Sequence, residues 1–225
     1  MKATLPLAIV LGISLLFTAC KEEKEDLQIA AATDFYPTQV GKFITYRLDS
    51  MVFTQQGRRE EMHVYQQKDV VDAAITDGQG RPSYRVYRFL RDSAGTQPWY
   101  SAGTYIVTPS LGSIEVQDNN MRTVRLISPV KKDQTWKGGR FLGTEPYSSA
   151  FLFSNDDDIG DWDYTISQTG ETVQLNGKTY TDVVTVDQVD ESFNVPVTAP
   201  GSFASRSFSR DKFAKGLGLI YQEYI

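Results

Sequence analysis

The sequence predicts an all-β protein in which an antiparallel sheet forms a β-sandwich or a half-open barrel. Short runs with apolar residues at every second position recur along the chain, as expected for strands with one buried face. Turn signals separate these runs, and Asn176-Gly177 is the strongest, because a two-residue hairpin turn needs a positive φ at both positions. Of the 225 residues, 206 follow residue 19, enough for one domain that folds without a disulfide.

The N-terminal segment is typical of an export signal. Lys2 supplies a short positive start, and residues 3–17 are almost entirely apolar. A membrane-spanning helix needs about 20 apolar residues, whereas this run stops sooner. We expect residues 1–19 to be a cleaved signal peptide. An N-terminal anchor helix that is never cleaved is the alternative.

Cys20 is the only cysteine of the chain, and it directly follows the apolar run. The stretch Phe17-Thr18-Ala19-Cys20 resembles a bacterial lipobox, although the family pattern prefers Leu where this chain has Phe17. The resemblance implies that Cys20 is acylated, with palmitate among its acyl groups, and becomes the first residue of the mature protein. Two or more acyl chains anchor a protein stably, so we expect a permanent attachment to the membrane.

The charged stretch after the cysteine suggests a location. Lys21-Glu22-Glu23 is similar to the export signal of Bacteroidota surface lipoproteins, a lysine followed by two acidic residues. The similarity implies display at the cell surface, on the outer membrane. A solvated spacer, with retention on the periplasmic side, is the alternative. We expect residues 20–33 to form a flexible lipidated tether and residues 34–225 to form the all-β domain.

The first half of the domain shows strand patterns. A turn over residues 35–41 leads into a strand whose apolar face is Ile44, Tyr46 and Leu48. Residues 62–75 and 84–90 flank a glycine-rich loop and predict a hairpin, with a helix over residues 58–72 as the alternative. Further strands are expected at residues 99–108, 113–117 and 122–127, the last two joined by a turn.

The second half contains the clearest hairpin. Trp162, Tyr164 and Ile166 alternate with polar residues, and Gly170 marks a bulge or bend. The turn at Asn176-Gly177 then sets strand residues opposite one another: Val173 and Tyr180 on one face, and Thr172 with Thr181 and Gln174 with Thr179 on the other. We expect residues 213–221 to form one final, glycine-kinked strand.

Both ends of the domain resemble uncharacterised Bacteroidota surface lipoproteins of all-β type. The similar stretches are Tyr36-Pro37 with Gly41, and Lys215-Gly216-Leu217-Gly218-Leu219-Ile220-Tyr221; residues 176–186 are loosely similar. Members of that family have no assigned activity. The resemblance therefore implies a fold and a location but no function.

Few residues point to catalysis or to a cofactor. His63 is the only histidine and lies in an expected strand, where a surface or cross-strand role is the common one. One cysteine and one histidine cannot make a structural zinc site, which needs about four such ligands. We expect no cofactor. The formal net charge is −5 and no basic patch stands out, so we expect no nucleic-acid partner.

The acidic stretch at residues 155–163 is the one place where residue types suggest a ligand. Oxygen ligands crowded on a loop can bind calcium, and Asp156, Asp158 and Asp161 are weak metal candidates. An EF-type loop that started at Asn155 would place Ile159 where a carboxylate is needed. A solvated acidic loop is therefore the expectation.

Aromatic residues leave a second class of ligand open. Trp99, Trp136 and Trp162 could form a sugar-stacking platform, although strands are rich in aromatic residues anyway. We expect a non-enzymatic binding or envelope-accessory lipoprotein, held to the membrane by its lipid, with a protein or glycan partner at the cell surface. A carbohydrate-binding lipoprotein of a glycan-uptake system is the alternative. A glycoside hydrolase, which needs two suitably spaced carboxylates, or a lipid carrier is the second alternative.

Overall fold

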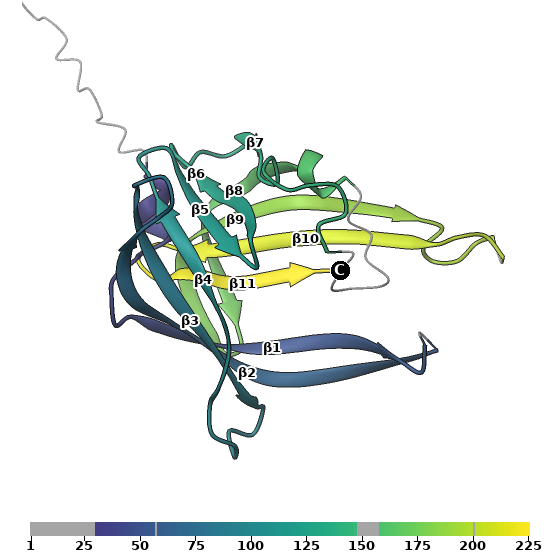
Figure 1. Ribbon diagram of the computed structural model, residues 1–225. Helices are drawn as coiled ribbons and strands as arrows, with labels where there is room; N and C mark the ends of the chain where they lie inside the picture. The colour runs from purple at the N-terminus through teal and green to yellow at the C-terminus, as the bar shows by residue number, and fades with distance from the viewer. Residues whose placement is uncertain (1–29, 57, 148–157, 200) are drawn as a thin grey trace, which may run out of the picture.

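The computed structural model describes residues 30–56, 58–147, 158–199 and 201–225 (Figure 1). Strands make up 61% and helices 4% of these residues, in two antiparallel sheets. The all-β prediction is therefore confirmed. The helix alternative for residues 58–72 is wrong, because this stretch lies in a strand from Arg59 onward.

Sheet A contains the first six strands in chain order, each antiparallel to the one before, and it curls into a half-barrel. Each strand expected in the first half of the domain lies inside a strand of this sheet, except that Trp99, the first residue of the expected strand 99–108, precedes β4 by one position. The strands are β1 (Phe43–Thr54), β2 (Arg59–Thr76), β3 (Pro82–Asp92), β4 (Tyr100–Pro109), β5 (Ser113–Asp118) and β6 (Met121–Ile127).

Sheet B contains the remaining five strands in the order β11-β10-β9-β8-β7. They are β7 (Thr135–Lys137), β8 (Asp163–Leu175), β9 (Lys178–Phe193), β10 (Ser205–Ala214) and β11 (Gly218–Tyr224). The short helix η2 (Ile159–Asp161) precedes β8.

The predicted turn between β8 and β9 is confirmed, since Asn176 and Gly177 have φ values of 50° and 76°. Val173 lies opposite Tyr180, and Gln174 opposite Thr179, as the sequence predicts. The expected pair of Thr172 with Thr181 is absent from the ladder, because the register shifts between Glu171 and Val173. Gly170, with φ +68°, lies in another irregular part of this ladder, which confirms the predicted bulge or bend.

The prediction of one kinked strand over residues 213–221 is wrong. Phe213 and Ala214 end β10, and Gly218 begins β11. Gly216 and Gly218 have φ values of +74° and +109°, a region that suits glycine, and the chain reverses direction there. This stretch is therefore the turn of a β10–β11 hairpin.

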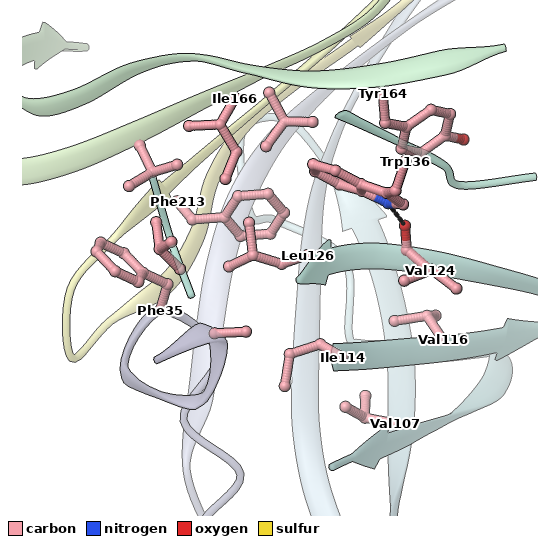
Figure 2. Packing of buried hydrophobic residues seen from close by; sticks show 14 of the residues in the cluster. Phe35, Val107, Ile114, Val116, Val124, Leu126, Trp136, Tyr164, Ile166 and Phe213 are labelled. Carbon is pink, nitrogen blue, oxygen red and sulfur yellow. Dashed lines mark hydrogen bonds between the residues drawn. The ribbon is translucent and has the colours of Figure 1, made fainter. Parts of the chain in front are cut away.

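The two sheets face each other across one apolar core, shown in Figure 2. Trp136 of sheet B donates a hydrogen bond of 2.8 Å from Nε1 to the carbonyl of Val124 in sheet A. The core is built from both sheets: Val107, Ile114, Val116, Val124 and Leu126 of sheet A, and Trp136, Tyr164, Ile166, Val184, Val186 and Phe213 of sheet B.

The short helix η1 (Ala32–Phe35) packs into this core, where Ala32 and Phe35 are buried. The backbone N–H of Ala32 donates to Ser128 Oγ at 2.9 Å, and the carbonyl of Ala30 accepts from the N–H of Val130 at 2.9 Å. Residues 30–32, which the sequence assigns to the tether, are therefore packed against the sheets, whereas Thr33 is exposed. The expected signal peptide and Cys20, Lys21, Glu22 and Glu23 lie outside the described residues.

The two seams between the sheets differ. On one side, the N–H of Val124 in β6 donates to the carbonyl of Gly138, just after β7, at 2.8 Å. On the other side, two side chains reach sheet B: Lys42 Nζ donates to the carbonyl of Gly216 in the β10–β11 turn at 2.8 Å, and the Tyr46 hydroxyl donates to the carbonyl of Leu219 in β11 at 3.0 Å. Both bridges lie near η1, and farther out the β1–β2 and β9–β10 hairpins diverge (Figure 1).

Candidate functional site

Charged residues line the inner face of the sandwich between the two sheets. Sheet A contributes Asp69 of β2, Arg88 of β3, Asp118 of β5 and Arg125 of β6, and sheet B contributes Asp211 of β10. We call these five residues the inter-sheet cluster. The sequence analysis missed it. The signal that could have indicated it is the presence of charged residues at inward positions of otherwise apolar strands.

Asp211 has a fully buried side chain. Its carboxylate accepts hydrogen bonds from Gln188 Nε2 at 2.9 Å, from Gln222 Nε2 at 3.0 Å and from Arg125 at 3.2 Å. Burial raises the pKa of Asp211 above its usual value, and the Arg125 charge opposes this. Burial is the largest single effect on the pKa of Arg125 and lowers it, but the Asp211 carboxylate and the neighbouring tyrosines together outweigh burial, so that pKa is raised. The two side chains therefore form an ion pair.

A β-bulge positions Arg125. Ile114 pairs with Leu126 and Glu115 pairs with Val124, so Arg125 is the extra residue of β6 at this point. An extra residue in one strand bends it and redirects a side chain. The bulge thus explains how an arginine next to two buried apolar residues reaches the opposite sheet.

The second half of the cluster centres on Arg88. Its guanidinium donates to Asp118 Oδ2 at 3.0 Å, and its Nε lies 3.8 Å from Asp69 Oδ1. This Nε is buried and has no hydrogen-bond partner. Asp69 also accepts from the Tyr105 hydroxyl at 3.0 Å and from Gln67 Nε2 at 3.0 Å. Burial raises the pKa of Asp69, and Arg88 opposes that shift.

Two small cavities adjoin the cluster. One, of about 60 Å³, is lined by the cluster itself, and the other, also of about 60 Å³, is lined mostly by apolar residues, among them Pro37, Ile44 and Val71. Tyr36 and Tyr105 line both. Each volume can hold a few water molecules, whereas small-molecule sites usually measure about 300–1,000 Å³. The cluster is therefore suited to joining the two sheets rather than to enclosing a ligand.

A different surface feature lies at the end of the β9–β10 hairpin. Four large apolar residues are exposed there: Phe193 (59%), Val195 (46%), Val197 (61%) and Phe203 (71%). The rings of Phe193 and Phe203 stack with centroids 6.5 Å apart. We call these four residues the apolar tip.

Asn194 holds the loop that carries the apolar tip. Its Oδ1 accepts hydrogen bonds from the backbone N–H groups of Thr198 at 2.8 Å and Ala199 at 3.0 Å. Its Nδ2 donates to the carbonyls of Ala199 at 3.2 Å and Phe203 at 3.3 Å. Asn194 has φ 52°, a conformation that asparagine tolerates better than most residues. One side chain thus ties together both halves of the loop.

The apolar tip lies far from η1. At the other end of β10, the carbonyl of Asp34 accepts from the N–H of Gly216 at 2.7 Å. Strands rise about 3.4 Å per residue, so the ten residues of β10 separate the tip from η1 by roughly 30 Å. Figure 1 shows this hairpin projecting beyond the rest of sheet B.

The sequence candidates for a metal site do not converge in the described residues. Asp158 precedes η2 and Asp161 is its last residue; both are exposed, and Asp156 lies outside the described residues. Lys137 Nζ pairs with Asp163 at 3.0 Å and also donates to the carbonyl of Asp161 at 2.5 Å. No group of three or more potential metal ligands occurs in the part of the chain that the structure describes.

His63 lies on β2, in a strand as the sequence predicts. Its Nδ1 is 3.3 Å from the Tyr65 hydroxyl, and its Nε2 is 3.5 Å from the Glu61 carboxylate. These neighbours sit two residues away on the same face of the strand. The ring is half-buried, and its contacts with neighbouring side chains of the same strand are typical of a surface histidine.

The three tryptophans lie in separate environments. Trp136 is buried in the core, against Tyr164. Trp162 packs near Tyr224, with ring centroids 6.3 Å apart. The Trp99 ring is covered by the Arg91 guanidinium, 4.3 Å from its centroid. The structure does not bring these rings together into one stacking platform.

Comparison of the chain with protein-family models, curated proteins and solved structures yields no match. Neither helix in the described ranges has the length and apolar character needed to cross a bilayer.

Proposed function

We propose that this chain is a lipoprotein anchored in the outer membrane through Cys20 and displayed at the cell surface, where it acts as a non-enzymatic binding module for another protein. The anchor and the location are supported by Phe17-Thr18-Ala19-Cys20 and by Lys21-Glu22-Glu23. The binding role rests on one observation, the apolar tip of the β9–β10 hairpin.

The apolar tip has the properties of a contact surface. Clustered exposed apolar residues are commonly found at interaction sites, whereas single ones are ordinary. The stacked rings of Phe193 and Phe203 offer a rigid aromatic anchor of the kind that dominates binding energy. Because Asn194 already orders the loop, less conformational entropy is lost when a partner binds.

The composition of the loop favours a protein partner. The neighbours of the two rings are Val195 and Val197, whereas a sugar site needs hydrogen-bonding groups beside its aromatic rings. Residues 194–204 contain no lysine or arginine that would draw the loop to an anionic membrane surface. A protein with a complementary apolar pocket fits this chemistry best, and a glycan partner remains the alternative.

In-cell photo-crosslinking tests this proposal. A photoreactive residue at Phe203 should give a crosslinked protein of discrete mass. The matched control is Leu111, which is fully exposed but lies at the β4–β5 turn, remote from the apolar tip. The control should give no such product. Val197→Ser should weaken the Phe203 product without changing the melting temperature.

Three outcomes would contradict the proposal. Equal products from both positions would show non-specific contact. Crosslinks to lipid alone would make the tip a membrane contact, and crosslinks to a polysaccharide would favour the glycan alternative.

A further inference from the structure

We infer that two copies of this chain associate through the free edges of their β1 strands, which pair antiparallel with Leu48 at the two-fold axis. The inference concerns the edge of sheet A and does not rest on the proposed role of the apolar tip. Its basis is the form of the edge, its exposed apolar residues and the order of its charges.

β1 is a long and regular edge strand. It stands at the end of the strand order of sheet A and has twelve residues, all paired to β2 without a register shift. Proteins usually protect such edges with short strands, prolines, charged residues (lysine above all) or bulges. β1 is long, has no proline, lysine or bulge, and carries two exposed charged residues of opposite sign, Arg47 and Asp49. Its outer edge is therefore a template on which another strand can pair.

The other sheet edges are less suited to pairing. β7, at one end of sheet B, has three residues. β6 is tied to the chain beyond β7 through the hydrogen bond from Val124 to Gly138. β11 has seven residues, and its Leu219 carbonyl already accepts from Tyr46. β1 is the edge with the longest uninterrupted run.

The outer face of β1 leaves large apolar side chains in water. Phe43 is 57% exposed, Met51 48% and Phe53 47%. All three project from the same face of the strand, where exposed and half-buried residues alternate without a break. Each of them has a β2 residue on one side, and Lys68 Nζ lies 4.7 Å from the centroid of the Phe43 ring. Pairing with another strand would place a further side chain on the other side and reduce this exposure.

The charges on the same face indicate that the strand pairing with β1 is the β1 strand of a second copy of this chain. Arg47 and Asp49 are exposed, and Arg47 Nε lies 2.7 Å from Asp49 Oδ1. With Leu48 on the two-fold axis, Arg47 of each copy stands opposite Asp49 of the other. The same register sets Phe43 opposite Phe53, and Thr45 opposite Met51. On the inner face it sets Ile44 opposite Val52.

The neighbouring two-fold registers are unfavourable. An axis at Arg47 places two arginines directly opposite each other, and an axis at Asp49 does the same with two carboxylates. Like charges directly opposite on paired strands are destabilising. A register shifted by one residue would instead set outer-face residues of one strand opposite inner-face residues of the other. Among the two-fold registers of β1, the one centred on Leu48 is the one that sets Arg47 opposite Asp49, so the charge order favours self-pairing in that register.

Charge reversal tests the inference on the mature full chain with its lipid, extracted in detergent and studied by size-exclusion chromatography with light scattering. The unchanged chain should be dimeric. Arg47→Asp and Asp49→Arg should each raise the dimer dissociation constant about tenfold or more, because each sets like charges opposite one another. The double exchange should return it to within about threefold. Unchanged circular dichroism would show that the exposed substitutions leave the fold intact.

Cysteine crosslinking tests the register in the same preparation. Leu48→Cys should form a disulfide-linked dimer, because the two residues are directly opposite. Ser50→Cys should not, since its two copies would lie about 14 Å apart along the strands, beyond the roughly 7 Å that a disulfide spans between Cα atoms. The unchanged chain controls for Cys20. A monomer, a dimer indifferent to both charge reversals, or a crosslink at residue 50 but not 48 would each overturn the inference.

Discussion

Arg125 of sheet A donates a hydrogen bond of 3.2 Å to the carboxylate of Asp211 in sheet B. The Asp211 side chain is fully buried, whereas a quarter of the Arg125 side chain reaches solvent. The pair therefore joins the two sheets inside the sandwich.

Replacing Asp211 with asparagine should destabilise the fold. The substitution replaces one of the two accepting oxygens with an NH2 donor, among three donors that now bond to them (Gln188, Gln222 and Arg125), and leaving buried donors unpaired costs about 1–3 kcal/mol. Because Arg125 is partly solvated, we expect a loss of roughly 2 kcal/mol in the free energy of unfolding, measured by denaturant titration. Asp190→Asn, which removes the exposed partner of Arg206, is the matched control and should cost under about 1 kcal/mol. Equal losses would contradict a special role for the buried pair.

The same substitution should show a defined pH dependence. Burial raises the pKa of Asp211 in the folded state, so the folded protein binds this proton more readily than the unfolded chain does. The stability that Asp211 contributes is thus fully present below the unfolded pKa of about 3.9 and is lost as the pH rises through the folded pKa. The stability difference between the unchanged chain and Asp211→Asn should therefore be larger near pH 4 than at pH 7. A difference that grows with pH would contradict this direction.

The β8–β9 turn should be sensitive to substitution. Asn176→Ala with Gly177→Val places two unsuited side chains at positive φ, where each costs about 1–2 kcal/mol. We expect a loss of that order per position in thermal or denaturant unfolding. Gln174→Ala with Thr179→Val changes an exposed pair beside the turn and serves as control. If both double variants unfold alike, the turn conformation is not what stabilises the hairpin.

The anchor has a direct chemical test. Cys20→Ala should abolish acylation and release a soluble protein from the membrane fraction, because the predicted lipid is its attachment. Membrane fractionation and metabolic labelling with a fatty acid report the two effects. A variant that stays in the membrane with its signal uncleaved would support the anchor-helix alternative instead.

The proposed surface location depends on the residues after the anchor. Replacing Lys21, Glu22 and Glu23 with alanine should preserve the lipid but remove protease accessibility on whole cells. Immunoblots of protease-treated cells, with a periplasmic protein as the integrity control, measure this. Unchanged accessibility would mean that the stretch is a plain spacer.

Sequence patterns located the strands whose buried face is apolar. In β1, Ile44, Tyr46 and Leu48 alternate with polar residues, and the strand lies where this alternation predicts it. β10 escaped prediction because its inward residues are polar: Ser207, Ser209 and Asp211 are buried. Its outer face instead carries Phe208 between Arg206 and Arg210, each guanidinium 5.2 Å from the ring centroid.

Neither candidate region could be assembled from local patterns. The inter-sheet cluster joins residues as distant as Asp69 and Asp211, and only the curl of sheet A against sheet B brings them together. The apolar tip could be predicted only by knowing that β9 and β10 form a long hairpin. Without it, Val195, Val197 and Phe203 resemble ordinary core residues in the sequence.

The position of η1 has a mechanical consequence for a protein held by its N-terminus. Ala30 and Ala32 are hydrogen-bonded to the segment after β6, and Asp34 is hydrogen-bonded to the β10–β11 turn. This short segment is therefore attached to both sheets, and we call it the clasp. If Cys20 is the anchor, as we propose, a pull applied through it reaches these bonds before it reaches any strand of the described residues. Tension at the membrane would therefore load the bond from Val130 to Ala30 and the packing of Ala32 first, and the sheets would separate only after the clasp had released.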